Sequence, residues 1–135
     1  IGSVAALKTI DIIEKKKTFE EILKISSHIR KNWIDIAKKN NLEIEIFGIN
    51  SILKFKFKSN NNNLYKGIIT HLMLKKGFLA NTTIYVSIAH TKKILDKYFK
   101  ELDKIFSIIE KIEKKIISKN KYKIKLPVSD FKRFN

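Results

Sequence analysis

Cysteine is absent from this chain of 135 residues, and proline and glycine are scarce, with one and four copies. Without cysteine, disulfides and thiolate metal sites are excluded, and a cytoplasmic location is the natural expectation. No apolar run approaches the roughly 20 residues that span a bilayer, so we expect no membrane partner. The N-terminal segment, 1–17, also lacks the charged start and small-residue cleavage site of a signal peptide. These absences leave one domain, long enough to bury a core.

The sequence also lacks the short motifs of common catalytic sites. No G-x-S-x-G elbow, P-loop or G-x-G-x-x-G is present, because the glycines are isolated from one another. His28, His71 and His90 form no H-x-x-x-H or H-E-x-x-H pair, so no zinc site is predicted. The carboxylate pairs Glu20/Glu21 and Glu43/Glu45 adjoin no apolar pocket that would make one an acid and the other a base. We therefore expect no catalytic or metal-ligating residues of the chain's own.

Arginine is scarce in a chain that is otherwise strongly basic. The formal net charge is +16 and the pI is near 10, which ordinarily indicates a nucleic acid or another polyanion as partner. Arginine occurs only at Arg30 and Arg133, although it is the residue that recognises phosphates and guanines in a bidentate way. Lysine is accompanied by frequent isoleucine and by four asparagines at 60–63. We interpret most of the charge as a compositional bias on solvated faces.

The hydrophobic periodicity predicts four helices and three strands in the order ααββαβα. A capping box at Thr18 and Glu21 is predicted to start the second helix, and 48–50 to connect a hairpin. The expected helices span about 4–16, 19–39, 64–76 and 92–117, and the expected strands 42–48, 51–58 and 78–89. The last helix is predicted to bury Ile94, Leu95, Tyr98, Leu102, Ile105, Phe106, Ile109 and Ile112.

This order of elements predicts an α+β fold, in which a small antiparallel three-stranded sheet is covered on one face by helices. Residues 1–118 are expected to form one domain and 119–135 a C-terminal tail, with no second domain. The chain opens at Ile1 without a methionine and is in a helical pattern almost at once. We interpret it as a fragment or processed piece of a longer protein.

The junction between the third strand and the last helix reads "AHTKK" at 89–93. Thr91 is predicted to be the N-cap that accepts a hydrogen bond from a first-turn amide, which is worth about 1 kcal/mol. Lys92 and Lys93 follow at the helix end where positive charge is least favourable. His90 is interpreted as a structural corner residue rather than a catalyst, and a phosphate site at this turn is left open.

Four motifs, in order along nearly the whole chain, resemble class III pyridoxal-phosphate-dependent aminotransferases. "IGSVAALKTIDII" (1–13) and "FEEILKISSHIRKNW" (19–33) resemble the segment that follows the cofactor-binding region. "FGINSILKFKF" (47–57) resembles the family's strand pair, and "LKKGFLANTTIYVSIAHTKKILDKYFKELDKIF" (74–106) its strand-to-helix region. "LPVSDFKRFN" (126–135) is similar to the ending of members close to glutamate semialdehyde aminomutases.

The resemblance implies the C-terminal small domain of a fold-type I enzyme that transfers or migrates an amino group. Pyridoxal phosphate would be bound in the parent protein by a large domain that carries the Schiff-base lysine, and the parent would be a homodimer. That large domain is absent here, so we expect this chain alone to bind no cofactor and to catalyse nothing. Many transaminases carry a carboxylate-binding arginine where Thr83 and Ile84 stand, which favours the aminomutase branch. The substrate-side loop that the resemblance implies contains Asn81, Thr82, Thr83, Tyr85 and Ser87.

Two other interpretations remain open from the residues. The first is a stand-alone basic module that binds nucleic acid or another polyanion through Lys54, Lys56 and Lys58, with Tyr65 and Lys66 nearby. Its binding would weaken steeply with salt. The second is a degenerate domain that is kept only for assembly.

Overall fold

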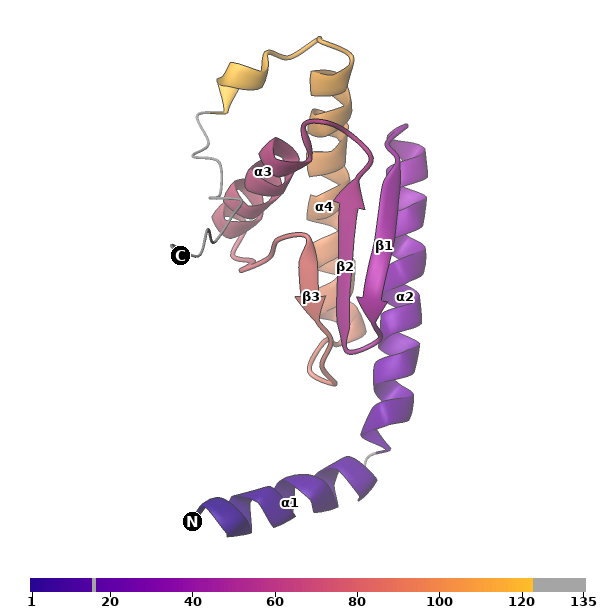
Figure 1. Cartoon of the computed structure of the whole chain (residues 1–135), viewed down its shortest axis with the longest axis vertical. Helices are drawn as coiled ribbons and strands as arrows, with labels where there is room; N and C mark the ends of the chain where they lie inside the picture. The colour runs from indigo at the N-terminus through magenta and orange to yellow at the C-terminus, as the bar shows by residue number, and fades with distance from the viewer. Residues whose placement is uncertain (16, 123–135) are drawn as a thin grey trace, which may run out of the picture.

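Helices and a three-stranded sheet make up the part of the chain that our computed structural model describes, residues 1–15 and 17–122 (Figure 1). The strands pair antiparallel in the order β1-β2-β3. The predicted α+β class and order of elements are confirmed. In chain order the elements are α1 (Gly2–Lys15), α2 (Thr18–Lys39), β1 (Ile44–Ile49), β2 (Ile52–Phe57), α3 (Asn62–Lys75), β3 (Thr83–Tyr85), α4 (Lys92–Glu113) and the 3-10 helix η1 (Lys119–Lys121).

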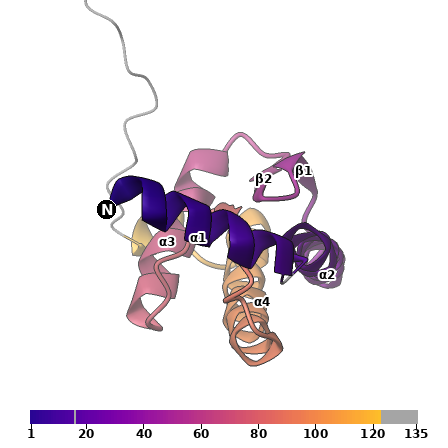
Figure 2. The same cartoon turned by 90° about the horizontal axis from the view of Figure 1, so that it is seen from below.

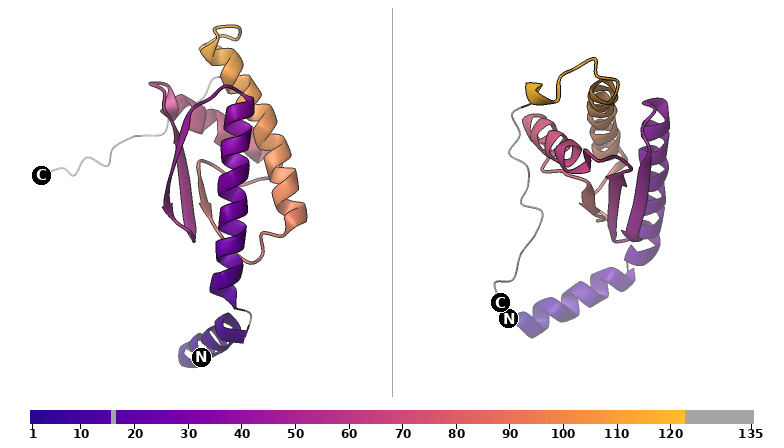
Figure 3. Two further views of the ribbon diagram at one scale, coloured as in Figure 1. Left: turned by 90° about the vertical axis from the view of Figure 1, so that its right-hand side faces the viewer. Right: turned by 45° about the horizontal axis from the view of Figure 1, so that its top comes forward.

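The sheet has one face covered by helices and one open face. Because side chains alternate along a strand, Leu53, Phe55 and Phe57 of β2 point to the covered face and are buried, whereas Lys54 and Lys56 are exposed. Helices α2, α3 and α4 lie on the same side of the sheet, as the views in Figures 1 and 3 agree. This arrangement is the two-layer fold that the alternation predicts.

An aromatic cluster fills the core between the sheet and the helices. Phe55 contacts Trp33 of α2 edge to face, with ring centroids 4.7 Å apart, and Phe106 of α4 at 5.8 Å. The Trp33 indole N–H, which is fully buried, donates to the Tyr98 hydroxyl across 3.1 Å. Aromatic contacts of this kind add to the free energy of area burial. The core therefore joins α2, α4 and β2 into one unit.

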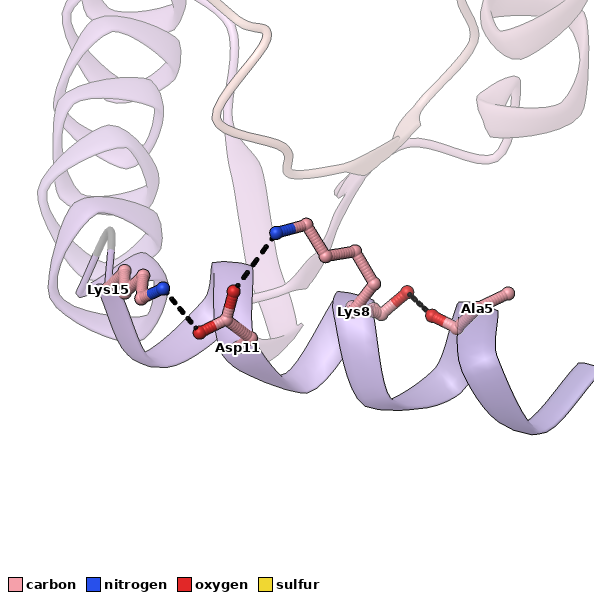
Figure 4. A network of polar contacts seen from close by, with 5 residues as sticks. Ala5, Lys8, Asp11 and Lys15 are labelled. Carbon is pink, nitrogen blue, oxygen red and sulfur yellow. Dashed lines mark hydrogen bonds and ion pairs between the residues drawn. The ribbon is translucent and has the colours of Figure 1, made fainter.

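Helix α1 differs from the other helices because none of its residues is buried. It crosses beneath the rest of the fold and packs against the start of α2 (Figures 1 and 2). Its Asp11 carboxylate pairs with Lys8 at 3.2 Å and Lys15 at 2.8 Å along one face (Figure 4). Val4 and Leu7 remain more than two-thirds exposed. Helix α1 therefore presents apolar side chains that the described residues do not cover. None of the described helices is long and apolar enough to cross a membrane.

The β1–β2 hairpin closes more tightly than the sequence indicates. Gly48 and Ile49 belong to β1, and the turn is Asn50 and Ser51 alone. Gly48 has a φ of +95°, in the region that favours glycine, and its carbonyl accepts from the Arg30 guanidinium at 3.1 Å. The buried Ser26 hydroxyl of α2 bonds the Asn50 side chain at 3.1 Å. Helix α2 therefore holds the hairpin tip at two points.

Several predicted boundaries and caps are wrong. The residue that precedes α2 is Lys17, in the left-handed conformation, so the Thr18 hydroxyl lies within the helix, buried without a partner among the described residues. The predicted capping box therefore does not form. The strand predicted over 78–89 shortens to β3, and α4 ends at Glu113, shortly before Lys115 adopts a φ of +58°. The tail motif at 126–135 lies outside the described residues.

Candidate functional site

The predicted substrate-side loop forms β3 and the two turns beside it. The Asn81 side-chain oxygen accepts from the Thr83 amide at 2.6 Å, which turns the chain into the strand. Thr82 is buried, and its carbonyl accepts from the Phe55 amide at 3.0 Å. Thr83 and Tyr85 then lie on the open face of the sheet, opposite Lys54 and Ile52 of β2. Only part of the predicted loop therefore faces outward, since Thr82 is an interior residue.

A tight corner at Ser87 and His90 leads from β3 to α4. The Ser87 amide donates to Nδ1 of His90 at 3.0 Å, and the His90 amide donates back to the Ser87 carbonyl at 3.0 Å. The Ser87 hydroxyl accepts from the Ala89 amide at 3.2 Å. Because Nδ1 accepts, this hydrogen bond requires the neutral ring with its proton on Nε2. The hydrogen bonds between His90 and Ser87 hold the chain in this corner. That His90 has a structural rather than a catalytic role stays a prediction.

Thr91 occupies the N-cap position of α4 but does not cap it with its side chain. Its backbone is extended, with φ −64° and ψ 156°, and its hydroxyl makes no cap hydrogen bond. The prediction of the position is correct, and the prediction of the hydrogen bond is wrong. Lys92 and Lys93 follow in a first turn that contains no acidic residue. The electrostatic mismatch that the sequence indicates at this helix end is therefore present.

Replacement of Thr91 by alanine should change the free energy of unfolding by less than about 0.5 kcal/mol, since no cap hydrogen bond is lost. Replacement by aspartate should stabilise the domain by about 0.3–1 kcal/mol, because a carboxylate offsets the positive end of the helix dipole. Urea unfolding followed by circular dichroism measures both values. A loss of about 1 kcal/mol or more in Thr91→Ala would show that the hydroxyl caps the helix in solution.

A mostly apolar groove of about 270 Å³ lies between β3 and the start of α4. Its polar lining groups come from Thr83, Tyr85, His90 and Tyr98. Its apolar lining comes from Phe78, Leu79, Ala80, Ile84, Ile94 and Leu95. Ile94 was predicted to be a core residue of α4 but is 43 % exposed, because its side chain borders this open groove. The predicted substrate-side residues Thr83 and Tyr85 therefore border the groove.

A polar hollow of about 740 Å³ lies at the opposite end of the hairpin, where the sequence predicted only a loop. The Ser59 hydroxyl donates to the Glu113 carboxylate at 2.6 Å. The side-chain amide of Asn61 donates to the Tyr65 hydroxyl at 3.3 Å. Hydrogen bonds from Ser59 and Tyr65 lower the pKa of Glu113. Burial, reinforced by the adjacent Glu113, raises the pKa of Tyr65 to about 12. The network fixes the end of α4 to the loop after β2.

The raised pKa of Tyr65 predicts a loss of stability in alkali. Above pH 10 the unfolded chain releases the tyrosine proton, whose ordinary pKa is about 10, while the folded chain keeps it up to about 12. The folded state then binds more protons, so the free energy of unfolding falls with pH by at most about 1.4 kcal/mol per unit. The difference between wild type and Tyr65→Phe, followed by urea unfolding from pH 9 to 12, isolates this contribution from that of the lysines. A pH-independent difference would contradict it.

The basic strand face differs from the polyanion site that was considered from the sequence. Lys56 pairs with Glu45 at 3.0 Å, and Lys58 lies 3.8 Å from Glu43. Tyr65 is fully buried on the other side of the sheet and cannot stack on a base. Two of the three lysines therefore lie close to carboxylates across the hairpin. The predicted position of Tyr65 beside this face is wrong. Polyanion binding itself stays a prediction.

The groove and the polar hollow do not fit a covalent pyridoxal phosphate site. Such a site needs a lysine that faces an enclosed cavity, together with donors for a phosphate. The lining of the groove at β3 includes no lysine, and Lys58, which lines the polar hollow, is exposed and close to Glu43. Within residues 1–15 and 17–122 no group of three or more potential metal ligands occurs either.

No family model matches this sequence. A solved structure is similar in fold, that of the pyridoxal phosphate internal aldimine form of the FumI protein from Sphingopyxis sp. MTA144. The TM-score is 0.70 with 19% sequence identity, over 82% of this chain. The match spans 27% of the FumI chain, so this chain corresponds to about a quarter of that protein. The fold of the present chain is therefore one that occurs as part of a pyridoxal phosphate enzyme.

Proposed function

We propose that this chain is the C-terminal small domain of a class III pyridoxal-phosphate-dependent aminotransferase, of the kind close to glutamate semialdehyde aminomutases. The main observation in its favour is the fold similarity, over 82% of the chain, to part of the FumI protein, whose structure contains a pyridoxal phosphate internal aldimine. The collinear motifs at 1–33, 47–57 and 74–106 support the narrower assignment. The parent protein would transfer or migrate an amino group, with the cofactor as electron sink.

In this proposal the partner of the chain is the cofactor-binding large domain of the same protein. Helix α1 supports it, because its side chains Val4, Leu7 and Ile10 are all more than half exposed and remain available to a second folded surface. Phe19 at the start of α2 and Ile49 at the hairpin tip are exposed at the same end of the fold (Figure 1). The large domain would cover this end, provide the Schiff-base lysine and form the parent homodimer. A cytoplasmic location remains a prediction.

The role proposed for this domain is to border the substrate. Thr83 and Tyr85 stand on the open face beside the groove, and His90 contributes its ring at the corner. Segment 81–87 contains no arginine that could bind a substrate carboxylate. That absence supports an aminomutase over a dicarboxylate transaminase.

Two measurements test the proposal. The coding sequence upstream of Ile1 should encode, in frame, a domain with a lysine that forms the aldimine, and deletion of 1–135 from that protein should abolish amino transfer. The chain alone, treated with about one equivalent of pyridoxal phosphate and borohydride, should show labels scattered over its lysines by peptide mass spectrometry. Stoichiometric labelling of a single lysine, or an upstream region without a cofactor domain, would overturn the proposal.

A further inference from the structure

Strand β3 is an edge strand whose outer side has backbone groups available for pairing. On its inner side, the Val86 amide donates to the Ser51 carbonyl at 2.8 Å, and the Thr82 carbonyl accepts from the Phe55 amide at 3.0 Å. Backbone groups of successive residues point to opposite sides of a strand. Ile84 therefore also faces β2, whereas the amide and carbonyl of Tyr85 and the carbonyl of Thr83 face outward.

The outward backbone groups of β3 have no hydrogen-bond partner among the described residues, except for the Thr83 amide. The Thr83 amide is already bound by the Asn81 side chain at 2.6 Å. The Tyr85 amide and the two carbonyls have no backbone or side-chain partner within residues 1–15 and 17–122. Unpaired edge groups are a template for another strand. The free set is one donor and two acceptors, which is enough to align a short extended segment.

The groove borders β3, and its lining includes residues of β3, of α4 and of the segment that precedes β3. The apolar lining includes Ile94 and Leu95 of α4 and Leu79, which is 94 % exposed. Tyr85 stands above it with 71 % of its surface exposed. A further strand beside β3 would cover Ile94 and Leu79 in the way that β2 covers the core. The volume of about 270 Å³ suits a few side chains of one strand rather than the surface of a folded domain.

The charge around the groove indicates the chemistry of the segment that fits. Lys92 and Lys93 stand in the first turn of α4, next to the lining residue Ile94, and take part in no ion pair among the described residues. Positive side chains at a helix N-terminus, added to the helix dipole, attract carboxylates. An extended segment with acidic residues flanking apolar ones therefore complements this edge in hydrogen bonding, shape and charge.

We propose that β3 and the adjacent groove bind an extended apolar segment with acidic flanks, from another polypeptide, as a fourth strand of the sheet. Main-chain hydrogen bonds to Tyr85 and Thr83 give the pairing, and alternate side chains enter the groove over Ile94. The inference does not depend on the proposed enzymatic function, because it rests on the edge of β3, the groove and the two lysines at the start of α4.

The test uses the full chain labelled with ¹⁵N and a blocked peptide of about eight residues, alternating valine and threonine between glutamates at both ends. Titration should shift the Tyr85, Leu79 and Ile94 amide signals in a saturable way and slow hydrogen exchange of the Tyr85 amide. The same peptide with alternate backbone nitrogens methylated should not bind, and a lysine-ended version should bind more weakly at low salt. Absence of saturable binding by the glutamate-ended peptide would overturn the proposal.

A matched pair of variants locates the hydrogen bond. Tyr85→Pro removes the outward amide and places a ring at the edge, while the ladder to β2 keeps its bonds. Tyr85→Thr removes the same aromatic side chain and retains the amide. Tyr85→Pro should bind the peptide at least about tenfold more weakly than Tyr85→Thr, since one backbone hydrogen bond and the edge itself are lost. Equal affinities, or a dimer of the chain that Tyr85→Pro abolishes, would show a different occupant and overturn the proposal.

Discussion

Replacement of Gly48 by alanine is expected to lower the free energy of unfolding by about 2–5 kcal/mol. Two costs add at this position. The φ of +95° is strained for any residue with a Cβ atom, and a Cβ at Gly48 would lie 2.3 Å from the Ile52 carbonyl oxygen. That oxygen belongs to the backbone of the paired strand, so the contact is relieved only by opening the hairpin. Urea unfolding followed by circular dichroism measures the loss.

Gly77→Ala is the matched control for the conformational part of this cost. Its φ is +80°, but a Cβ there meets nothing within 4 Å. The control should therefore lose only about 1 kcal/mol, from strain without a clash. If Gly48→Ala costs no more than Gly77→Ala, the hairpin accommodates the Cβ and its close approach does not limit stability.

The fold was predictable because its two layers are visible as periodicities. The alternation of Leu53, Phe55 and Phe57 with lysines fixes which face of β2 is buried, and the apolar stripe of α4 fixes the side that meets it. Element type and order follow from such long patterns. The lysine face was also correctly placed outward, although the cross-strand pairing of Lys56 with Glu45 required the register of the hairpin.

The errors lie where a local signal competes with a tertiary one. The extended composition of 78–89 predicts a long strand, but β3 pairs with only three residues of β2. The turn at Asn81 and the corner at Ser87 and His90 lie on either side of it. Ile94 follows the stripe of α4, yet it is partly exposed because it borders the open groove beside β3. The polar network of Ser59, Tyr65 and Glu113 joins residues more than 40 positions apart, and no periodicity reports such a contact.

The candidate site was predictable only in part for the same reason. The segment 81–87 and His90 were found through a resemblance, and the structure places Thr83, Tyr85 and His90 around one groove while Thr82 is buried. The free edge of β3 could not be predicted from the sequence, because the pairing of backbone groups does not depend on a recognisable side-chain pattern. A groove formed between a strand and a helix depends on packing that pattern analysis does not measure.

Truncation of Phe55 to alanine is the second large effect that we expect, at about 3–5 kcal/mol. Phe55 is 2 % exposed and contacts Trp33, Phe57 and Phe106, so its removal leaves a cavity where α2, α4 and the sheet meet. A domain of this size is stable by about 5–15 kcal/mol in total. The variant should therefore unfold at a much lower urea concentration, which tryptophan fluorescence of Trp33 reports directly.

Phe47→Ala is the control for this truncation because it removes the same side chain from the same hairpin. Phe47 lies on the open face, 43 % exposed, with the Lys56 ammonium 6.0 Å from its ring. Its removal should cost less than about 1 kcal/mol, since little buried area is lost and no enclosed cavity forms. Comparable losses for the two variants would mean that the open face is covered in solution. A large gap between them shows that the stability of this domain comes from the helix-covered face of the sheet, which leaves the open face and the edge of β3 free for partners.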